Sequence, residues 1–422
     1  EPSVFQEPGW PADLPDLTPY YERARAVIQP SVHPEPPVKS LVLREAVTRF
    51  AKASNQSPAP FDLVPIAVNF VDNYDRSDTG NRQDACVNCG GCVTGCNYTA
   101  KNTVDMTYLS IAEREGAEIY VLTEVLGIGR QGAGYEVHVR DHRNGEESVI
   151  SASQIVLAAG TLGTYRVLKK SESDFGLDVP NGCGLGFSGN GDVLGFGYDT
   201  HEAAAPQSGP TITSRVSYRT DPDVKNHFIV EDGGLPQAVT AILRAALPFV
   251  RRTHGPDDRG LGERLRDWVH TTADFVGLTS FGALQRSIVY LGMGTEQNEG
   301  QLYLEGDDVK IRWPGVAQQP FAQRIDDHME QLTYAIHGEY VKNPEPRSFL
   351  RQRLITAHPL GGCPMGTDPA VSVVDVKGAM HGHQGKFFIA DGSILPTALG
   401  VNPALTISAL AEHIMEGITQ SW

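Results

Sequence analysis

The chain has 422 residues, 40% of them hydrophobic, so it can bury a sizeable core and is long enough for two or three domains of roughly 150 residues each. Acidic side chains outnumber basic ones by 51 to 35, and the resulting net charge of −16 argues against binding nucleic acid or an anionic membrane through a basic face. No apolar run reaches the ~18 residues that cross a bilayer, so we expect a soluble protein without a membrane span. The first residues have neither the charged nor the apolar region of an export signal, so we expect a cytoplasmic protein, with a removed export signal as the alternative.

The first 40 residues are rich in proline, which predicts an extended arm with one helical stretch at 20–28. The apolar run at 154–159 is typical of a strand buried on both faces. The remaining pattern predicts helices at 112–116, 161–170, 234–250 and 403–418, and strands at 118–126, 135–140, 148–158 and 386–390. This mixture indicates an α/β protein of mixed α+β composition.

Two Gly-x-Gly-x-x-Gly strings occur, but neither has the setting of a dinucleotide-binding loop, which follows a strand and opens a helix. The string at Gly127, Gly129 and Gly132 precedes another strand, so we interpret it as a hairpin turn. The string at 184–189 leads into residues 190–198 without a helix. The sequence therefore predicts that this chain has no Rossmann opening of its own.

Four of the six cysteines lie close together, at positions 86, 89, 92 and 96. The spacing of Cys86, Cys89, Cys92 and Cys96 resembles the run that holds an iron–sulfur cluster in bacterial ferredoxins, although Asn97 stands where proline usually follows. Structural thiols, some of them disulfide-linked, are an equal alternative. A zinc site ranks third, because zinc motifs space their cysteine pairs more widely.

The other two cysteines, Cys183 and Cys363, are isolated in the sequence and need no role beyond packing.

The segment 356–418 holds the most informative chemistry. His358 precedes a proline and two glycines, and an imidazole with a pKa of about 6.5 can accept a hydroxyl proton at neutral pH. Asn402 and Pro403 open the final helix, whose free N–H groups and positive dipole end face whatever lies before them.

Two acidic and two histidine residues elsewhere are given no catalytic role. Glu231 and Asp232 are placed in a loop before the helix at 234–250, where they could shape a substrate lid. His381 and His383 form an H-x-H in a glycine-rich turn, which is more typical of solvated histidines than of a metal site.

Several motifs, in chain order, resemble the glucose–methanol–choline (GMC) flavin oxidoreductases and, within them, the cholesterol-oxidase-like branch. They are PGWP at 8–11, PYYERA at 19–24, GCNYTAKNTVDMTYL at 95–109, LAAGTLGT at 157–164, SGNGD at 188–192, HPLGG at 358–362, ADGS at 390–393 and GVNP at 400–403. The resemblance implies a GMC-type FAD-binding fold joined to a substrate domain with a mixed or antiparallel sheet and helices. It divides the chain into an arm and the first part of the substrate domain (1–105), part of the FAD domain (106–190), the substrate domain (191–375) and the C-terminal part of the FAD domain (376–422).

The same resemblance assigns the site. His358 would take the hydroxyl proton as hydride leaves for the flavin, and Asn402 would orient the hydroxyl. Asp391 and Gly392 would hold the ribityl and pyrophosphate portion of FAD. Val125 would meet the adenine through its backbone, and the helix start at Asn402 and Pro403 would face the flavin pyrimidine edge.

In this family the Gly-rich flavin loop belongs to a first βαβ unit ahead of PGWP, where this sequence begins. Cleavage, a separate subunit or loss of flavin binding would each explain a chain with that unit missing. We favour a heteromer in which a second protein chain supplies the Rossmann loop, because an orphan final strand and helix would expose a large apolar face.

The function expected is FAD-dependent oxidation of a secondary alcohol in a bulky substrate such as a sterol, with dioxygen or a protein as electron acceptor. Two alternatives remain open. One is an iron–sulfur electron-transfer subunit centred on the cysteine run, and the other is a redox-neutral flavoprotein lyase or isomerase.

Overall fold

The computed structural model describes residues 5, 9–221, 223–236, 239–240, 253, 269–270, 282–341 and 355–420. Most of the helix predicted at 234–250 lies outside these residues. The helices are α1 Thr18–Ile28, α2 Val38–Ala53, α3 Ser110–Arg114, α4 Gly160–Phe175, α7 Pro320–Ala335 and α8 Ala404–Thr419, with short π or 3₁₀ turns at Asp105–Leu109, Val224–Asn226, Val316–Gln318 and Gly392–Ile394. The strands are β1 Phe61–Leu63, β2 Tyr74–Arg76, β3 Asn81–Gln83, β4 Thr123–Gln131, β5 Gly134–Asp141, β6 Glu147–Ala152, β7 Ile155–Leu157, β8 Val193–Tyr198, β9 Ser214–Tyr218, β10 Phe228–Gly233, β11 Ile288–Gly294, β12 Gln301–Glu305, β13 Asp308–Arg312, β14 Glu339–Val341 and β15 Phe387–Ile389.

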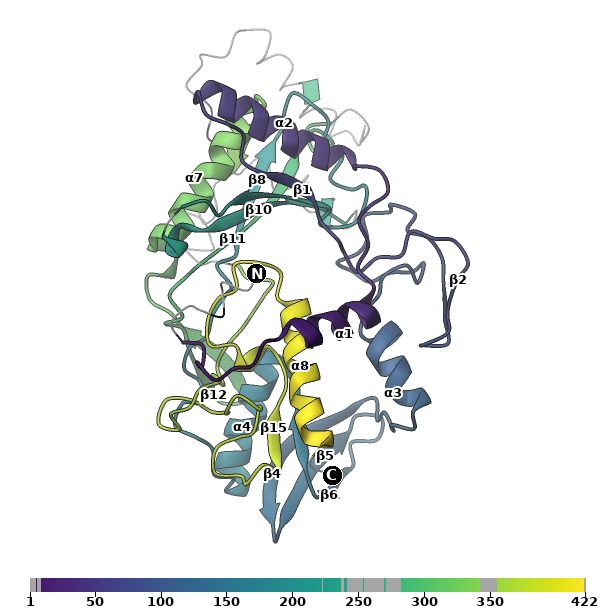
Figure 1. Cartoon of the computed structure of the whole chain (residues 1–422), viewed down its shortest axis with the longest axis vertical. Helices are drawn as coiled ribbons and strands as arrows, with labels where there is room; N and C mark the ends of the chain where they lie inside the picture. Colours follow the sequence, from purple (N-terminus) through teal and green to yellow (C-terminus); the bar gives the residue numbers. More distant parts are fainter. Residues whose placement is uncertain are drawn as a thin grey trace.

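One half of the molecule is built on a six-stranded antiparallel sheet in the order β1-β9-β10-β11-β8-β14. Successive side chains of a strand point to opposite faces, so alternate residues form two layers. Val230 and Tyr290 pack under α2 and α7, which cover one face (Figure 1). Ile229 and Met293 face the other way and contact Val401 near the start of α8. This second face borders the candidate site.

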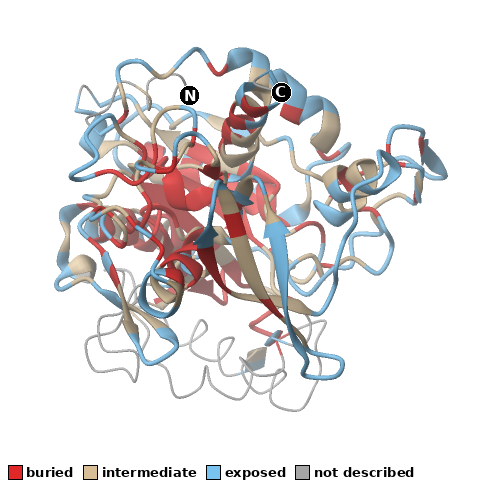
Figure 2. Ribbon diagram, turned by 90° about the horizontal axis from the view of Figure 1, so that it is seen from below, coloured by how far each residue is buried: buried red, intermediate tan, exposed pale blue. Residues whose placement is uncertain are grey.

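The other half is built around the parallel pair β15–β7, flanked by α4 and α8, and the antiparallel sheet β4-β5-β6 (Figure 1). Helix α1 packs against α8, where Tyr20 Oη donates to Glu416 Oε1 at 3.1 Å and Tyr21 Oη lies 2.7 Å from Thr406 Oγ1. Buried residues gather in the interior, whereas β6 is exposed along most of its length (Figure 2).

Most predicted helices and the strand at 386–390 are confirmed with small shifts of their ends. The strand at 154–159 is not buried on both faces, because β7 pairs only with β15 among the described residues and Val156 is 42% exposed. The predicted strand at 148–158 is two strands, β6 and β7, which belong to different sheets. The predicted strand at 118–126 begins only at Thr123.

The prediction that the first glycine string forms a hairpin turn is wrong for two of its three glycines. Gly127 and Gly129 lie inside β4, and only Gly132 is in the β4–β5 turn. A Cβ on Gly127 would lie 2.4 Å from the ring of Phe175, so this glycine lets the end of α4 pack on the strand. As expected, the string opens no helix, and neither does the one at 184–189, which leads to β8.

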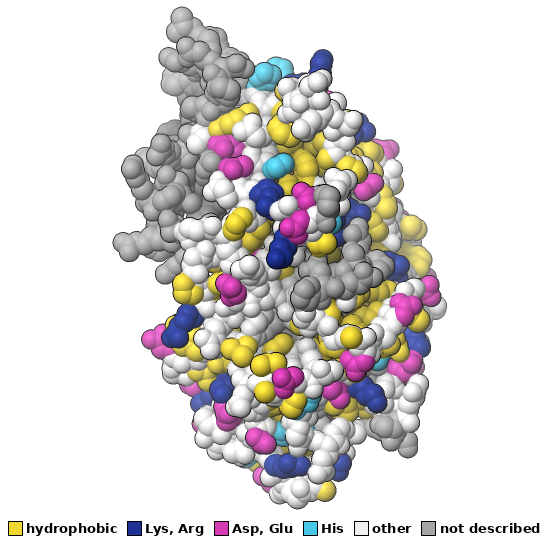
Figure 3. Space-filling view, turned by 60° about the vertical axis from the view of Figure 1, so that its left-hand side comes forward, with side chains coloured by type: hydrophobic (Ala, Val, Ile, Leu, Met, Phe, Trp, Pro, Cys, Tyr) yellow, Lys and Arg dark blue, Asp and Glu magenta, His cyan; other side chains and the backbone are white. Residues whose placement is uncertain are grey.

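Acidic and basic side chains are interspersed on the face in Figure 3 rather than gathered by sign. Within the described residues, no helix is both long and apolar enough to cross a bilayer.

Candidate active site

His358 is held by a buried carboxylate. Its Nδ1 lies 2.9 Å from Oδ1 and 3.1 Å from Oδ2 of Asp192, which is 2% exposed. Asp192 Oδ2 also accepts from Ala357 N at 2.8 Å and from Thr356 Oγ1 at 3.0 Å. Because an ionised carboxylate only accepts, Nδ1 carries the hydrogen and Nε2 is left with a lone pair.

Asn402 is exposed and contacts a second buried carboxyl, since its Nδ2 donates to Glu231 Oε2 at 3.3 Å. Glu231 is 1% exposed. Burial raises its pKa to about 8, helped by the charges of Asp232 and Asp192 and opposed by the Asn402 hydrogen bond and by Arg215. Glu231 is therefore a neutral acid at pH 7.

The loop predicted at Glu231 and Asp232 is wrong, because both residues lie in the central strand β10 and are fully buried. Their side chains point to opposite faces of the sheet. Asp232 faces α2, where Lys39 Nζ forms an ion pair with Asp232 Oδ2 at 3.4 Å and donates to the carbonyls of Pro210 and Thr211 at 2.6 and 2.7 Å. Asp232 also accepts four further hydrogen bonds, from Ser40 Oγ, Thr213 Oγ1, Thr213 N and Ser214 N.

The turn at 188–192 joins the two halves of the site. Asn190 donates through Nδ2 to Val401 O at 2.8 Å, and its Oδ1 accepts from Leu399 N at 2.8 Å and Gly400 N at 3.1 Å. Two residues later, Asp192 binds His358. The segments that carry Asn402 and His358 are thus fixed to one turn.

A further carboxyl, that of the partly buried Glu296, is hydrogen-bonded to this turn. It accepts from Ser188 Oγ at 2.5 Å and from the backbone of Gly189 and Gly191, and burial raises its pKa to about 7.

Apart from Val125, the residues expected to hold FAD lie in the segment between β15 and α8. Asp391 is 7% exposed, and its carboxylate accepts from Gly160 N at 2.9 Å, Thr164 Oγ1 at 2.5 Å and Ser393 N at 2.8 Å. Gly392 is buried beside Ile407. Pro403 occupies the N-cap position of α8, which has no side-chain cap. Val125 lies at a bulge in β4, half-buried.

The space beside these residues suits a cofactor. A Cβ on Gly160 would meet no atom within 4 Å, and the neighbouring apolar side chains Val156 and Leu162 are 42% and 39% exposed. The uncapped N-terminus of α8 favours an anionic or electron-rich group in front of it. The residues present therefore fit the flavin that the motifs imply.

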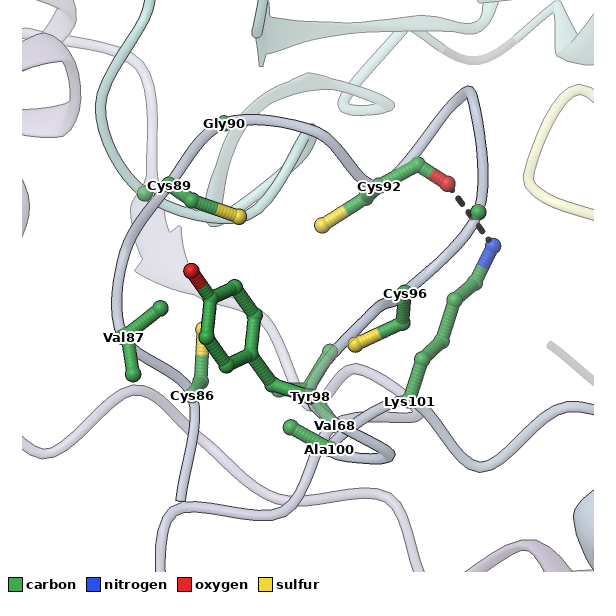
Figure 4. A pocket seen from close by; sticks show the side chains of 12 residues that line it. Val68, Cys86, Val87, Cys89, Gly90, Cys92, Cys96, Tyr98, Ala100 and Lys101 are labelled. Atoms are coloured by element: carbon green, nitrogen blue, oxygen red, sulfur yellow. Dashed lines mark hydrogen bonds between the residues drawn. The ribbon is translucent and has the colours of Figure 1, made fainter. Parts of the chain in front are cut away.

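The cysteine run forms a loop pressed against the segment 207–209. Gly90 has φ +71°, and a Cβ there would lie 2.1 Å from Gln207 O, so only glycine allows this approach. Gly209 N donates to Asn88 O at 3.0 Å. The four thiols of Cys86, Cys89, Cys92 and Cys96 line one small cavity of about 20 Å³, with the Tyr98 ring among them (Figure 4).

Nothing in the described part of the chain brings three or more His, Cys, Asp or Glu side chains close enough to hold a single metal ion. The two histidines of the H-x-H motif contact other protein groups instead. His383 is buried, not solvated as predicted, and its ring nitrogens contact Tyr135 Oη at 3.0 Å and Asp178 O at 2.7 Å. His381 Nε2 lies 3.1 Å from Ser372 Oγ.

Sequence reasoning missed Asp192, Asn190 and Glu231 as parts of the site. The SGNGD motif at 188–192 was a usable signal for the first two, since it sets Asn190 between two glycines and Asp192 directly after them. Glu231 had no such signal, because only the sheet brings it to Asn402.

The GMC oxidoreductase family matches the chain at residues 73–177 through its N-terminal part and at 299–411 through its C-terminal part. The chain belongs to this family of flavoproteins, which oxidise alcohols with FAD.

Among individual proteins, it is similar to the cholesterol oxidase of Mycobacterium tuberculosis, with 24% identity over 94% of this chain and 71% of the relative. It is also similar to the cholesterol oxidase of Acinetobacter baumannii, with 25% identity over 80% of this chain and 62% of the relative. The long-chain-alcohol oxidase FAO4A of Arabidopsis thaliana is 37% identical over 76% of this chain and 45% of its own length.

Two solved structures share the fold. An FAD-dependent oxidoreductase from Chaetomium thermophilum has a TM-score of 0.57 at 14% identity, covering 99% of this chain and 82% of that one. Pyridoxine 4-oxidase from Mesorbium loti has a TM-score of 0.54 at 15% identity, covering 90% and 70%.

Proposed function

We propose that this chain oxidises a secondary alcohol in a bulky, largely apolar substrate such as a sterol, and that His358 is the base. The observation that carries the proposal is the His358–Asp192 pair, which one turn fixes relative to Asn402 and Glu231. The similarity to cholesterol oxidases supports the sterol class.

In this proposal His358 Nε2 accepts the hydroxyl proton of the substrate. Asp192 holds the ring in one tautomer and stabilises the imidazolium that forms. Asn402 orients the hydroxyl, and its own amide is oriented by Glu231. Bound FAD would take the hydride from the carbinol carbon. The residues that would hold FAD are Asp391, Gly392, the helix start at Pro403 and, at the adenine, Val125.

We further propose that a Gly-rich dinucleotide-binding segment, on a partner chain, completes the FAD site. The support is that Val156, in the two-stranded parallel pair β15–β7, is exposed. This apolar surface lies next to the expected cofactor.

The substrate class is tested by mixing the flavin-loaded holoprotein anaerobically with a panel of alcohols. We expect 3-hydroxysterols to bleach the flavin absorbance faster than primary alkanols of similar length, because the secondary carbinol and bulky ring system match the proposed class. Bleaching by the alkanols alone would overturn the sterol assignment and keep the alcohol oxidation.

Glu231 predicts a basic limb in the pH profile of flavin reduction. Below a pKa of about 8 its carboxyl is neutral, and above that value it is an anion that opposes negative charge developing beside Asn402. The rate should fall as the pH rises through about 8, and Glu231→Gln, which is neutral throughout, should lack this limb. Stopped-flow flavin reduction between pH 6 and pH 10, with ~1 unit steps, measures it. The same limb in both proteins would exclude Glu231 as its origin.

A second candidate function, electron transfer through an iron–sulfur cluster, is supported by the four thiols that face one cavity. Four thiolates from one short run supply the full ligand set of a cubane cluster. Tyr98, which is 45% exposed, would have to turn outward to make room. Within the described residues, the four thiols are not arranged to hold a single metal ion, so zinc is the weaker alternative.

The cluster proposal predicts iron and acid-labile sulfide in holoprotein purified without oxygen. Cys92→Ser should lose both, because it removes a ligand, whereas the matched variant Cys183→Ser should keep them. Elemental analysis and low-temperature EPR provide the measurements. If the wild-type protein contains no iron and its flavin is still fully reduced by substrate, the cluster proposal is wrong and the cysteine run consists of structural thiols.

A further inference from the structure

Cys183 and Cys363 are far apart in the sequence but lie opposite each other in the fold. Ser188 and Leu360 form an antiparallel bridge. Toward the cysteines, Gly184 N donates to Gly362 O at 2.7 Å, and Gly362 N donates to Leu185 O at 3.1 Å. Continuing this antiparallel register by one residue places position 183 across from position 363. Both side chains belong to one apolar cluster, in which Cys183 packs against the buried residues that include Cys363.

The two thiols differ in access to solvent. Cys363 is fully buried, and its N–H donates to Ser393 O at 2.9 Å. Cys183 is only partly buried, in a loop closed by its own N–H on Pro180 O at 3.0 Å. The hydrogen bond with Cys183, and then burial, raise the pKa of Cys363 well above its usual value. Cys183 is therefore the sulfur that an oxidant reaches first.

We propose that Cys183 and Cys363 are a redox-active dithiol that closes to a disulfide when hydrogen peroxide reaches Cys183. The Cys183 thiolate attacks one peroxide oxygen, the O–O bond breaks, and the products are a sulfenic acid on Cys183 and hydroxide, which takes the proton lost by the thiol. The Cys363 sulfur then attacks the Cys183 sulfur, the S–O bond breaks, and the hydroxyl leaves as water with the proton of Cys363. In sum, two thiols and one peroxide give one disulfide and two waters.

Both loops are already anchored by backbone hydrogen bonds on each side of the pair, so little freedom has to be lost when the bond forms. The bond would join the loop after α4 to the segment that carries His358, at a point where Gly361 N donates to Gly392 O at 3.0 Å. The proposal rests on this geometry alone and is independent of the alcohol-oxidising function.

Peptide mapping tests the proposal directly. Trypsin places Cys183 in the peptide 171–215, Cys363 in 354–377 and the whole cysteine run in 83–101, so cross-links between them are distinguishable. The full-length holoprotein is treated with hydrogen peroxide, blocked with iodoacetamide and digested without reduction. We expect a linked species of 171–215 and 354–377, two hydrogens lighter than the sum of the peptides, which disappears on reduction with dithiothreitol.

Thiol titration of the unfolded protein gives the matched controls. Peroxide should remove two more titratable thiols from the wild type than from Cys183→Ser, whereas Cys96→Ser should form the 171–215 to 354–377 link like the wild type. The proposal is overturned if peroxide oxidises Cys183 to a sulfinate or sulfonate while Cys363 stays a free thiol. It is also overturned if both peptides remain unlinked under conditions that oxidise the run at 83–101.

Discussion

Replacing His358 by Ala should slow substrate-dependent flavin reduction by about 10²- to 10⁴-fold, the usual contribution of a positioned general base. In the proposed mechanism the buried Asp192 carboxylate accepts the hydrogen of His358 Nδ1, so that Nε2 takes the hydroxyl proton. Single-turnover stopped-flow reduction with saturating alcohol measures the chemical step directly, and added imidazole should restore part of the lost rate.

His142→Ala is the matched control, since this imidazole is 52% exposed and pairs with Glu124 at the surface of the β4-β5-β6 sheet. It should reduce flavin at the wild-type rate. A His358→Ala rate close to that of the control would remove His358 from the mechanism.

Replacing Asp232 by Ala should destabilise the protein by about 3–5 kcal/mol, because it leaves the buried Lys39 ammonium without its counter-charge. Lys39 is 1% exposed, and its remaining partners would be two carbonyl oxygens. Urea unfolding followed by far-UV circular dichroism measures the loss as a fall in the transition midpoint.

An exposed ion pair on the same sheet gives the comparison. Asp62→Ala removes the partner of Arg215 at 3.8 Å, where the Asp62 side chain is 56% exposed, and this should cost no more than about 1 kcal/mol. Equal midpoint shifts in the two variants would show that the Lys39–Asp232 pair is not a buried stabilising contact.

Local patterns were sufficient for much of the fold. The helices α1, α4 and α8 were predictable from the local residue pattern, with a proline near the start of α1 and of α8, and the buried strand β15 from its apolar run. The division of 148–158 into two strands was not predictable, because β6 continues the neighbouring hairpin with β5 whereas β7 pairs with β15, more than 200 residues away in the sequence.

The candidate site divides in the same way. His358 and Asn402 could be singled out because they stand in motifs with a local physical meaning, and their roles stay predictions. Glu231 was placed in a loop and given no catalytic role, since nothing near it in the chain indicates that β10 presents it to Asn402. Cys183 and Cys363 were treated as isolated for the same reason, as their proximity depends on the pairing of segments near 184 and 362.

Asn190 and Asp192 have a mechanical consequence for the enzyme. The side-chain amide of Asn190 is hydrogen-bonded to the backbone of 399–401, and the Asp192 carboxylate is hydrogen-bonded to 356–358. A displacement of the segment 399–401 therefore also displaces the segment 356–358. Thermal fluctuations of His358 and Asn402 should therefore be correlated, and their separation should vary less than the position of either one.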